Sequence, residues 1–265
     1  MATITMETLG VNSVTKPIIK PTDWRFATVT RIRVEAPGLR SYTFEFDEPV
    51  EHYAGQHYEI RLTAPDGYQA ARLYSAAMPA NGRGRTLELT IALMPHGEVS
   101  TYLYNNVKAG SQIELRGPLG NYFTWEPSQT EPILLVGGGV GVAPLRAIRL
   151  AHQQACADCP IRLLYSARSY ADMAYKYELF PKGGKPAMDL TMAFTEVAPD
   201  GWDGYARRID QVMINEVLKD FTDPPTCYVC GPTPMVEAVT TYLVKAGLDP
   251  NTIKAERFGS TEPHD

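Results

Sequence analysis

The stretch RLYS, residues 72–75, places a cation, a phenol and a hydroxyl together between two runs of alternating apolar and polar residues. Alternate residues of a strand share a face, so Arg72 and Tyr74 would project from one side and Ser75 from the other. A strand that only packs into a core gains little from a guanidinium beside a phenol. A ligand with a phosphate and a flat ring would use both, because a planar guanidinium suits a phosphate and an aromatic face suits a heterocycle.

A glycine cluster, LLVGGGVGVAPL at residues 134–145, joins a continuous apolar run to a predicted helix. Glycines let the backbone turn tightly and approach a pyrophosphate, and a helix N-terminus offers free N–H groups with a partial positive charge. The spacing departs from the GxGxxG fingerprint, because Val142 follows Gly137 and Gly139 at the third position. The strand–turn–helix context nevertheless favours a dinucleotide-binding loop.

A third motif, YVCGPTPMVEAV at residues 228–239, is typical of a strand that ends at Cys230, a turn at Gly231 and Pro232, and a helix. Ligands of open α/β sheets bind outside the carboxyl ends of the strands, where Cys230 would stand. The alternative is that Cys230 is a small core residue.

A fourth motif, HGEVSTYL at residues 96–103, puts Gly97 and Ser100 at the entry to another predicted helix. The free N–H groups at such an entry could hold a phosphate. The alternative is that Ser100 only caps the helix.

The four cysteines fall into two CxxC pairs, Cys156/Cys159 and Cys227/Cys230. Two such pairs are compatible with a zinc site. The second pair lies in a predicted buried strand, in which residues three apart face opposite sides and chelate poorly. We therefore expect free thiols and no metal.

Composition narrows the function classes. The 265 residues carry a net charge of −5 and no basic run, which argues against a nucleic-acid binder. No apolar stretch approaches the roughly 18–20 residues that a membrane span needs. The N-terminus lacks the pattern of a secretory signal, so a cytoplasmic location is expected, and residues 1–21 are predicted to be a loose tail.

The rest of the chain divides into two regions with different patterns of apolar and polar residues. Residues 22–126 show short alternating runs separated by Gly, Pro and Asn, which predict an antiparallel barrel or sandwich. Its expected strands are 26–36, 40–46, 57–64, 72–75, 87–94 and 111–117, with one helix at 98–106. Residues 127–265 alternate apolar runs with helical patterns, which predicts a doubly wound α/β parallel sheet. Its expected strands are 131–138, 161–167, 189–196, 226–231 and 253–258, and its expected helices are 143–155, 173–181, 209–220 and 234–247.

Taken in order, the four motifs resemble the ferredoxin–NADP reductase superfamily over nearly the whole chain after residue 22. RLYS is similar to the family's RxYS flavin motif, GGGVGVAP to its GGGxGxxP nucleotide loop, VCGPTPM to its CGPxxM motif, and AERFG to its C-terminal strand. The resemblance implies an FAD-binding β-barrel domain over residues 22–126, followed by an NAD(P)-binding α/β domain over residues 127–265.

The resemblance also implies roles for single residues. Arg72 would hold the flavin phosphate, Tyr74 would pack on the isoalloxazine ring, and Ser75 would lie beside N5, the atom that accepts the hydride. Ser75, Cys230 and Glu256 are the candidate catalytic residues. The candidate FAD-binding residues are Arg72, Leu73, Tyr74, Ser75, Gly97, Val99, Ser100 and Phe258. The candidate nucleotide-binding residues are Gly137, Gly138, Gly139, Val140, Cys230, Gly231, Pro232 and Met235.

Two departures from the family pattern stand out. Leu93 and Met94 occupy the stretch where the family often has a basic residue, and Val140 replaces the usual threonine of the glycine loop. Phosphate neutralisation would therefore depend more heavily on Arg72 and on helix N–H groups.

Ser166, Arg168 and Lys176 follow the second predicted strand of the parallel sheet, where an acid would favour NADH. A hydroxyl and two cations could instead hold the 2′-phosphate of NADP, and the pattern is similar to that of NADP-binding members. The alternatives are that Lys176 is merely solvated and that Arg168 is compatible with NADH.

The resulting expectation is a stand-alone FAD- and NAD(P)-binding oxidoreductase without an iron–sulfur domain. It would pass electrons from NADPH through FAD to a separate one-electron acceptor such as ferredoxin or flavodoxin. One alternative is the NADH-dependent reductase component of a multicomponent oxygenase. An alternative of another class is a flavin- or nucleotide-binding module with a sensing or assembly role and little turnover.

Overall fold

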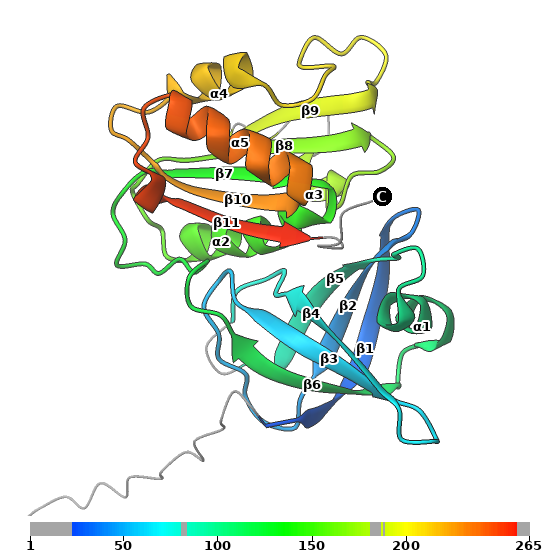
Figure 1. Ribbon diagram of the computed structural model, residues 1–265. Coiled ribbons are helices and arrows are strands. Elements are labelled where there is room, and N and C mark those ends of the chain that lie inside the picture. Colours follow the sequence, from blue (N-terminus) through cyan, green and yellow to red (C-terminus); the bar gives the residue numbers. More distant parts are fainter. Residues whose placement is uncertain (1–22, 81–83, 181–186, 188, 259–265) are drawn as a thin grey trace, which may run out of the picture.

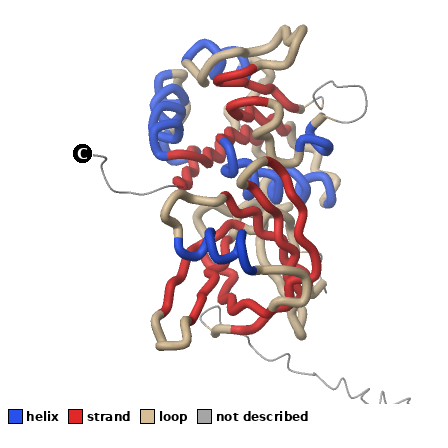
Figure 2. Tube along the Cα trace, turned by 90° about the vertical axis from the view of Figure 1, so that its right-hand side faces the viewer, coloured by secondary structure: helices blue, strands red, loops and turns tan. Residues whose placement is uncertain are grey.

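A computed structural model describes residues 23–80, 84–180, 187 and 189–258. The expected tail at residues 1–21 lies outside this part of the chain. The described residues form two layered units, an antiparallel sheet that curls into a barrel and a parallel sheet flanked by helices (Figures 1 and 2). The predicted fold class is therefore confirmed.

The first unit has six antiparallel strands in the order β4-β3-β6-β1-β2-β5. Its edge strands approach each other through the bridge between Ala76 and Leu89 and through a hydrogen bond from the Ala77 N–H to the Glu88 carbonyl at 2.8 Å. This contact closes the sheet into a barrel around side chains such as Tyr42 and Tyr58. The elements are β1 Arg25–Ala36, β2 Leu39–Glu45, β3 His57–Thr63, β4 Gln69–Ser75, β5 Thr86–Ala92, α1 Glu98–Asn106 and β6 Gln112–Leu119.

The second unit has five parallel strands in the order β11-β10-β7-β8-β9. These are β7 Ile133–Gly138, β8 Ile161–Ser169, β9 Leu190–Val197, β10 Thr226–Pro232 and β11 Ile253–Phe258. The helices are α2 Val142–Gln154, α3 Lys176–Leu179, α4 Gln211–Leu218 and α5 Thr233–Lys245, with short 3-10 turns at Gly139–Gly141 and Pro250–Thr252.

Successive side chains of the parallel strands point to opposite faces of the sheet and belong to two hydrophobic cores, one on each face. Leu135 and Cys230 pack with α2 on one face, whereas Leu134 and Cys227 pack with α4 and α5 on the other. The prediction that Cys227 and Cys230 face opposite sides of one strand is confirmed. Within the described residues, no group of His, Cys, Asp or Glu side chains could hold a metal ion.

The connection between the two sheets is tied to the parallel sheet by three hydrogen bonds. The Tyr122 hydroxyl donates to the Ile253 carbonyl at 3.0 Å. The Lys254 ammonium and the Tyr228 hydroxyl donate to the Thr124 carbonyl at 3.0 and 2.9 Å. The chain that leaves the barrel is thus attached to β10 and β11 before it enters β7.

The structure corrects one predicted helix. Of the described residues 173–180 in the expected helix 173–181, only Lys176–Leu179 are helical, because Tyr175 has a left-handed backbone (φ 53°) that interrupts a helix. Met173, Ala174 and Tyr175 are instead buried against the core under α2. Burial of these side chains overrides their local helical pattern.

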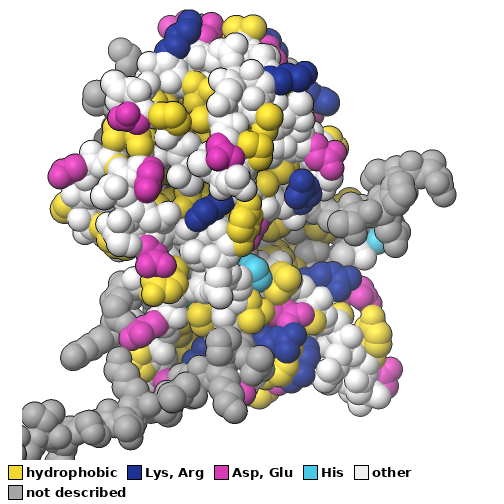
Figure 3. Space-filling view, turned by 60° about the vertical axis from the view of Figure 1, so that its left-hand side comes forward, with side chains coloured by type: hydrophobic (Ala, Val, Ile, Leu, Met, Phe, Trp, Pro, Cys, Tyr) yellow, Lys and Arg dark blue, Asp and Glu magenta, His cyan; other side chains and the backbone are white. Residues whose placement is uncertain are grey.

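No described helix is long and apolar enough to pass through a lipid bilayer. On the face drawn in Figure 3, acidic and basic side chains are interspersed with hydrophobic ones. Neither sign of charge dominates that face.

Candidate functional site

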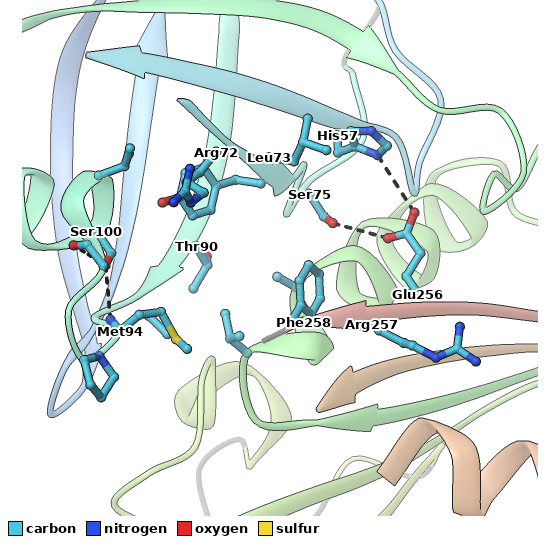
Figure 4. A pocket seen from close by; sticks show the side chains of 17 residues that line it. His57, Arg72, Leu73, Ser75, Thr90, Met94, Ser100, Glu256, Arg257 and Phe258 are labelled. Atoms are coloured by element: carbon cyan, nitrogen blue, oxygen red, sulfur yellow. Dashed lines mark hydrogen bonds and ion pairs between the residues drawn. The ribbon is translucent and has the colours of Figure 1, made fainter. Parts of the chain in front are cut away.

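A cavity of about 610 Å³ lies where the barrel meets the carboxyl end of the parallel sheet (Figure 4). Both units line it. The barrel contributes side chains from β3, β4, β5 and the start of α1, and the parallel sheet contributes β11, Val140 and Ala143. The sequence-predicted residues that line it are Arg72, Leu73, Tyr74, Ser75, Gly97, Val99, Ser100, Val140, Glu256 and Phe258.

The residues of RLYS form the end of β4 and lie along this cavity. Arg72 is exposed, and its guanidinium donates to the Ala71 carbonyl at 2.7 Å. Among the described residues it forms no ion pair with a carboxylate. Tyr74 is half-buried against the barrel core, and this burial raises the pKa of its hydroxyl to about 12, against the opposing effect of Arg72. Leu73 is 52% exposed at the cavity. A cation, an aromatic ring and an apolar side chain of β4 therefore all line the cavity.

Ser75 meets Glu256 at the junction of the two units. The Ser75 hydroxyl donates to Glu256 Oε2 at 3.5 Å (Figure 4). Burial raises the pKa of Glu256 to about 7, although the bond from Ser75 acts in the opposite direction. The carboxyl group is therefore poised to gain or lose a proton near neutral pH.

His57 is a site residue that was not singled out from the sequence. It pairs directly with Ser75 across the β3–β4 hairpin, and its Nδ1 lies 3.9 Å from Glu256 Oε1 (Figure 4). Burial lowers the pKa of His57, against the effect of Glu59, so the imidazole is neutral at neutral pH. Knowledge of the hairpin register would have identified it.

Cys230 lies one strand away from Glu256. The two residues are paired between β10 and β11. Cys230 is fully buried, and both this burial and the nearby Glu256 raise the pKa of its thiol. The thiol is therefore neutral, and it belongs to the residue paired with Glu256 on the neighbouring strand.

The glycine loop is packed against the end of β10 so closely that side chains are excluded. A Cβ on Gly141 would lie 2.2 Å from the Cys230 carbonyl oxygen, and a Cβ on Gly138 would lie 2.3 Å from the Met235 sulfur. Gly139 has a left-handed backbone (φ 54°). These glycines let the β7–α2 turn pass beside β10, whose end carries Gly231 and Pro232.

The turn before α1 is built around Ser100. Its hydroxyl accepts from the Met94 N–H at 3.1 Å and donates to the Gly97 carbonyl at 3.2 Å. Gly97 is the residue that precedes the helix, so Ser100 closes the turn rather than capping α1. Gly97, Val99 and Ser100 thereby present the start of α1 to the cavity.

Ser166 and Arg168 lie in the second half of β8, and Lys176 is the first residue of α3. The Arg168 guanidinium bonds to Asp172 Oδ1 at 2.7 Å, and Asp172 Oδ2 accepts from Ser169 at 2.6 Å. The Lys176 ammonium lies 5.9 Å from the ring centre of Tyr170 and 5.8 Å from that of Tyr177. Asp172 was missed from the sequence, although its position four residues after Arg168 is a recognisable signal.

Except for Val140, the predicted nucleotide-binding residues of the glycine loop and of the β10–α5 turn are not among those that line the cavity. Gly137 and Gly138 end β7, Gly139 begins the 3-10 turn, and Cys230, Gly231 and Pro232 end β10. Ligands of parallel sheets bind at such ends. The arrangement therefore offers a pocket for a flat, phosphate-bearing ligand on the barrel, and a second approach from the sheet.

Comparison with known proteins matches this division. The family model described as "Oxidoreductase FAD-binding domain" matches residues 27–124, and that described as "Oxidoreductase NAD-binding domain" matches residues 135–241.

Full-length relatives share both units. The reductase component of the naphthalene 1,2-dioxygenase system from Pseudomonas putida is 30% identical, over 86% of this chain and 68% of its own length. The glycine betaine monooxygenase reductase subunit of Chromohalobacter salexigens is 26% identical, over 84% of this chain and 61% of its own length. The chain thus spans about two thirds of the length of these relatives.

A solved structure has the same arrangement. The ferredoxin reductase of carbazole 1,9a-dioxygenase superposes with a TM-score of 0.75 and 26% identity, covering 89% of this chain and 70% of the other.

Proposed function

Because the chain belongs to the ferredoxin–NADP reductase superfamily of flavoprotein oxidoreductases, we propose that it transfers a hydride from a reduced nicotinamide nucleotide to FAD and passes the electrons to a separate acceptor protein. The single observation that carries this proposal is the cavity. It joins the RLYS wall of the barrel to Glu256 on β11 and to Val140 of the glycine loop.

The residues at the cavity fit a flavin. The exposed Arg72 guanidinium and the start of α1 supply positive charge for a diphosphate. Tyr74 and Phe258 supply aromatic faces for a flat ring system. When bound, FAD accepts the hydride and releases the electrons one at a time.

The protein's own contribution is orientation and control of one proton. Ser75 holds Glu256 from the barrel side, while Cys230 supports it from the neighbouring strand. Ser75, Cys230 and Glu256 are the proposed catalytic residues, because the resemblance implies that they would lie near the nicotinamide and the flavin. Ser75 and Cys230 are buried, which limits their movement, and a fixed alignment of two reactants accounts for much of the rate of such a reaction.

The glycine loop would receive the pyrophosphate of the nucleotide. The close packing of Gly138 and Gly141 against β10 fits this role, because it leaves the loop backbone without side chains that would block a ligand. Gly231, Pro232 and Met235 would border the nucleotide from the β10 side.

For the electron donor we propose NADPH, held by the Ser166 hydroxyl and the cations Arg168 and Lys176. A second candidate is an NADH-dependent reductase component of a multicomponent oxygenase. The bond between Arg168 and Asp172 favours it, because an arginine already paired with a carboxylate binds a second anion less strongly. In either case the proposed acceptor is a separate ferredoxin, flavodoxin-like protein or oxygenase component.

The test is anaerobic titration of the purified yellow protein with NADPH and with NADH in parallel. Bleaching of the flavin absorbance by either nucleotide is the expected result, and the ratio of the two kcat/KM values with an artificial acceptor identifies the donor. A protein that binds FAD but is bleached by neither nucleotide would be a binding or sensing module, and the proposed function would be wrong.

A further inference from the structure

A second set of contacts joins the barrel to the parallel sheet behind the cavity, and Tyr175 lies at its centre. This residue precedes α3, is 4% exposed and has a left-handed backbone. An aromatic residue adopts this conformation rarely, and only where its surroundings fix it. The surroundings that fix Tyr175 belong mostly to the other unit.

Tyr175 is bound to the barrel through both its backbone and its side chain. Its N–H donates to Glu35 Oε2 at 3.0 Å, and its hydroxyl lies 2.5 Å from the Thr90 hydroxyl. The Thr90 hydroxyl lies 2.8 Å from that of Ser41, which donates to Glu35 Oε1 at 2.7 Å. These contacts form a closed ring of hydrogen bonds that starts and ends at Tyr175.

The direction of each bond in the ring follows from Glu35. An ionised carboxylate only accepts, so Ser41 donates to it, Thr90 donates to Ser41, and Tyr175 donates to Thr90. Burial raises the pKa of Tyr175, so its hydroxyl keeps the proton that it donates. The Ser41 and Thr90 hydroxyls therefore each donate one bond and accept one, the Tyr175 hydroxyl donates one, and the loss of any of the three hydroxyls interrupts the closed set of bonds.

Arg146 of α2, in the parallel-sheet unit, packs against the aromatic ring of Tyr175. Its guanidinium carbon lies 4.5 Å from the centre of the aromatic ring. The same guanidinium donates to the Ala77 carbonyl at 2.8 Å, to Glu88 at 3.1 Å and to Glu178 at 2.7 Å. Because Ala77 and Glu88 belong to the barrel, Arg146 is a second bond between the two units at the same place.

Thr90 connects this interface to the cavity. It lines the cavity opposite the residues of β11 and is bonded to Tyr175 on its other side (Figure 4). Tyr175 itself lies in the segment between Arg168, near the end of β8, and Lys176, the first residue of α3. One side chain therefore links the proposed nucleotide segment to the wall of the proposed flavin cavity.

We propose that Tyr175 is a positioning residue for hydride transfer. Through its bond to Thr90 it fixes the parallel sheet relative to the barrel, so that a nucleotide on the sheet reaches a flavin on the barrel at one separation. This inference rests on the proposed function. It differs from that function in that Tyr175 contacts neither reactant.

The test variant is Tyr175→Phe, which removes one hydroxyl and keeps the ring beneath Arg146. In anaerobic stopped-flow mixing, we expect the rate constant of flavin reduction to fall about tenfold, since a small misplacement of the reactants is enough for such a loss. The Kd of the nucleotide, taken from the concentration dependence, should change less than twofold. Tyr177→Phe is the matched control, because Tyr177 is 82% exposed, and its rate constant should equal that of the wild type.

Two variants of Thr90 separate positioning from a general loss of stability. Thr90→Val should show the same tenfold decrease, and the double variant with Tyr175→Phe should lose no more, because both changes break one ring. Thr90→Ser keeps the hydroxyl and should restore the wild-type rate constant. A wild-type rate constant in Tyr175→Phe, or additive losses in the double variant, would overturn the proposal.

Hydrogen exchange of the protein without nucleotide tests the role of Tyr175 independently of whether the flavin is reduced. Hydrogen exchange should become faster in Tyr175→Phe at Thr86–Ala92 and at residues 172–179, while β6, which holds no member of the ring, exchanges as in the wild type. Unchanged exchange at both segments would refute the positioning role even if the flavin is reduced normally. A wild-type protein that no nucleotide bleaches would refute the proposed function, and the exchange result would still decide whether Tyr175 fixes the interface.

Discussion

Replacement of Glu256 by glutamine tests whether the carboxyl group of Glu256 holds its proton more tightly in the folded protein than in the unfolded chain. Burial raises the pKa of this carboxyl group from its usual 4.5 to about 7. The folded protein therefore binds this proton more tightly than the unfolded chain does. The stability that the neutral form provides is complete below about pH 4.5 and is lost as the pH rises through 7.

The magnitude follows from the two pKa values. Each tenfold difference in proton affinity corresponds to about 1.4 kcal/mol, so the full loss between pH 4.5 and pH 8 is about 3 kcal/mol. Glu256→Gln cannot ionise, and its amide oxygen still accepts from Ser75. We expect its free energy of unfolding to match that of the wild type near pH 5, and to exceed it by about 3 kcal/mol at pH 8.

The assay is urea unfolding of both proteins at pH 5, 6, 7 and 8, at one fixed FAD concentration. Glu237→Gln is the matched control, because it removes the same charge from an exposed face of α5 and should show a difference that is independent of pH. A difference between wild type and Glu256→Gln that stays constant from pH 5 to pH 8 would refute the assignment of a neutral carboxyl group to the folded protein.

Three further predictions concern binding of the two ligands. Arg72→Gln should weaken FAD binding about 10- to 100-fold without unfolding the protein, because an exposed charge-assisted contact of about 1.5–3 kcal/mol is lost. Equilibrium dialysis measures the affinity for FAD, and an unchanged affinity would contradict the prediction. Gly141→Ala places a Cβ against the Cys230 carbonyl and should destabilise the protein by at least about 1 kcal/mol in urea unfolding, so a stable variant would mean that the loop can move. Asp172→Asn removes the partner of Arg168 and should raise the ratio of kcat/KM for NADPH over NADH; a ratio that stays the same or falls would show that this pair does not select the nucleotide.

The sequence was sufficient for most of the fold because the two sheets leave different patterns. The strands of the barrel are half-buried and alternate, whereas β7 is a continuous apolar run because both of its faces are covered. Helix α1 was predicted with its observed bounds, Glu98–Asn106. Short-range patterns decide these elements, so no tertiary information was needed.

The exceptions are residues whose state depends on partners far away in the chain. Tyr175 leaves the helical conformation because Glu35, 140 residues earlier, accepts its N–H. His57 belongs to the site only because the hairpin places it opposite Ser75. Arg168 looked like a free cation for a phosphate until its bond to Asp172 was seen. Periodicity carries no information on such pairings.

The closure of the barrel has a mechanical consequence. Edge strands β4 and β5 meet only near the bridge between Ala76 and Leu89, immediately after Ser75. Both strands also line the cavity, β4 through Arg72 and β5 through Thr90. A ligand bound in the cavity would contact both edge strands and so connect them. In the ligand-free protein, β4 and β5 should therefore separate before the other strands of the barrel do, and ligand binding should stabilise the closed barrel.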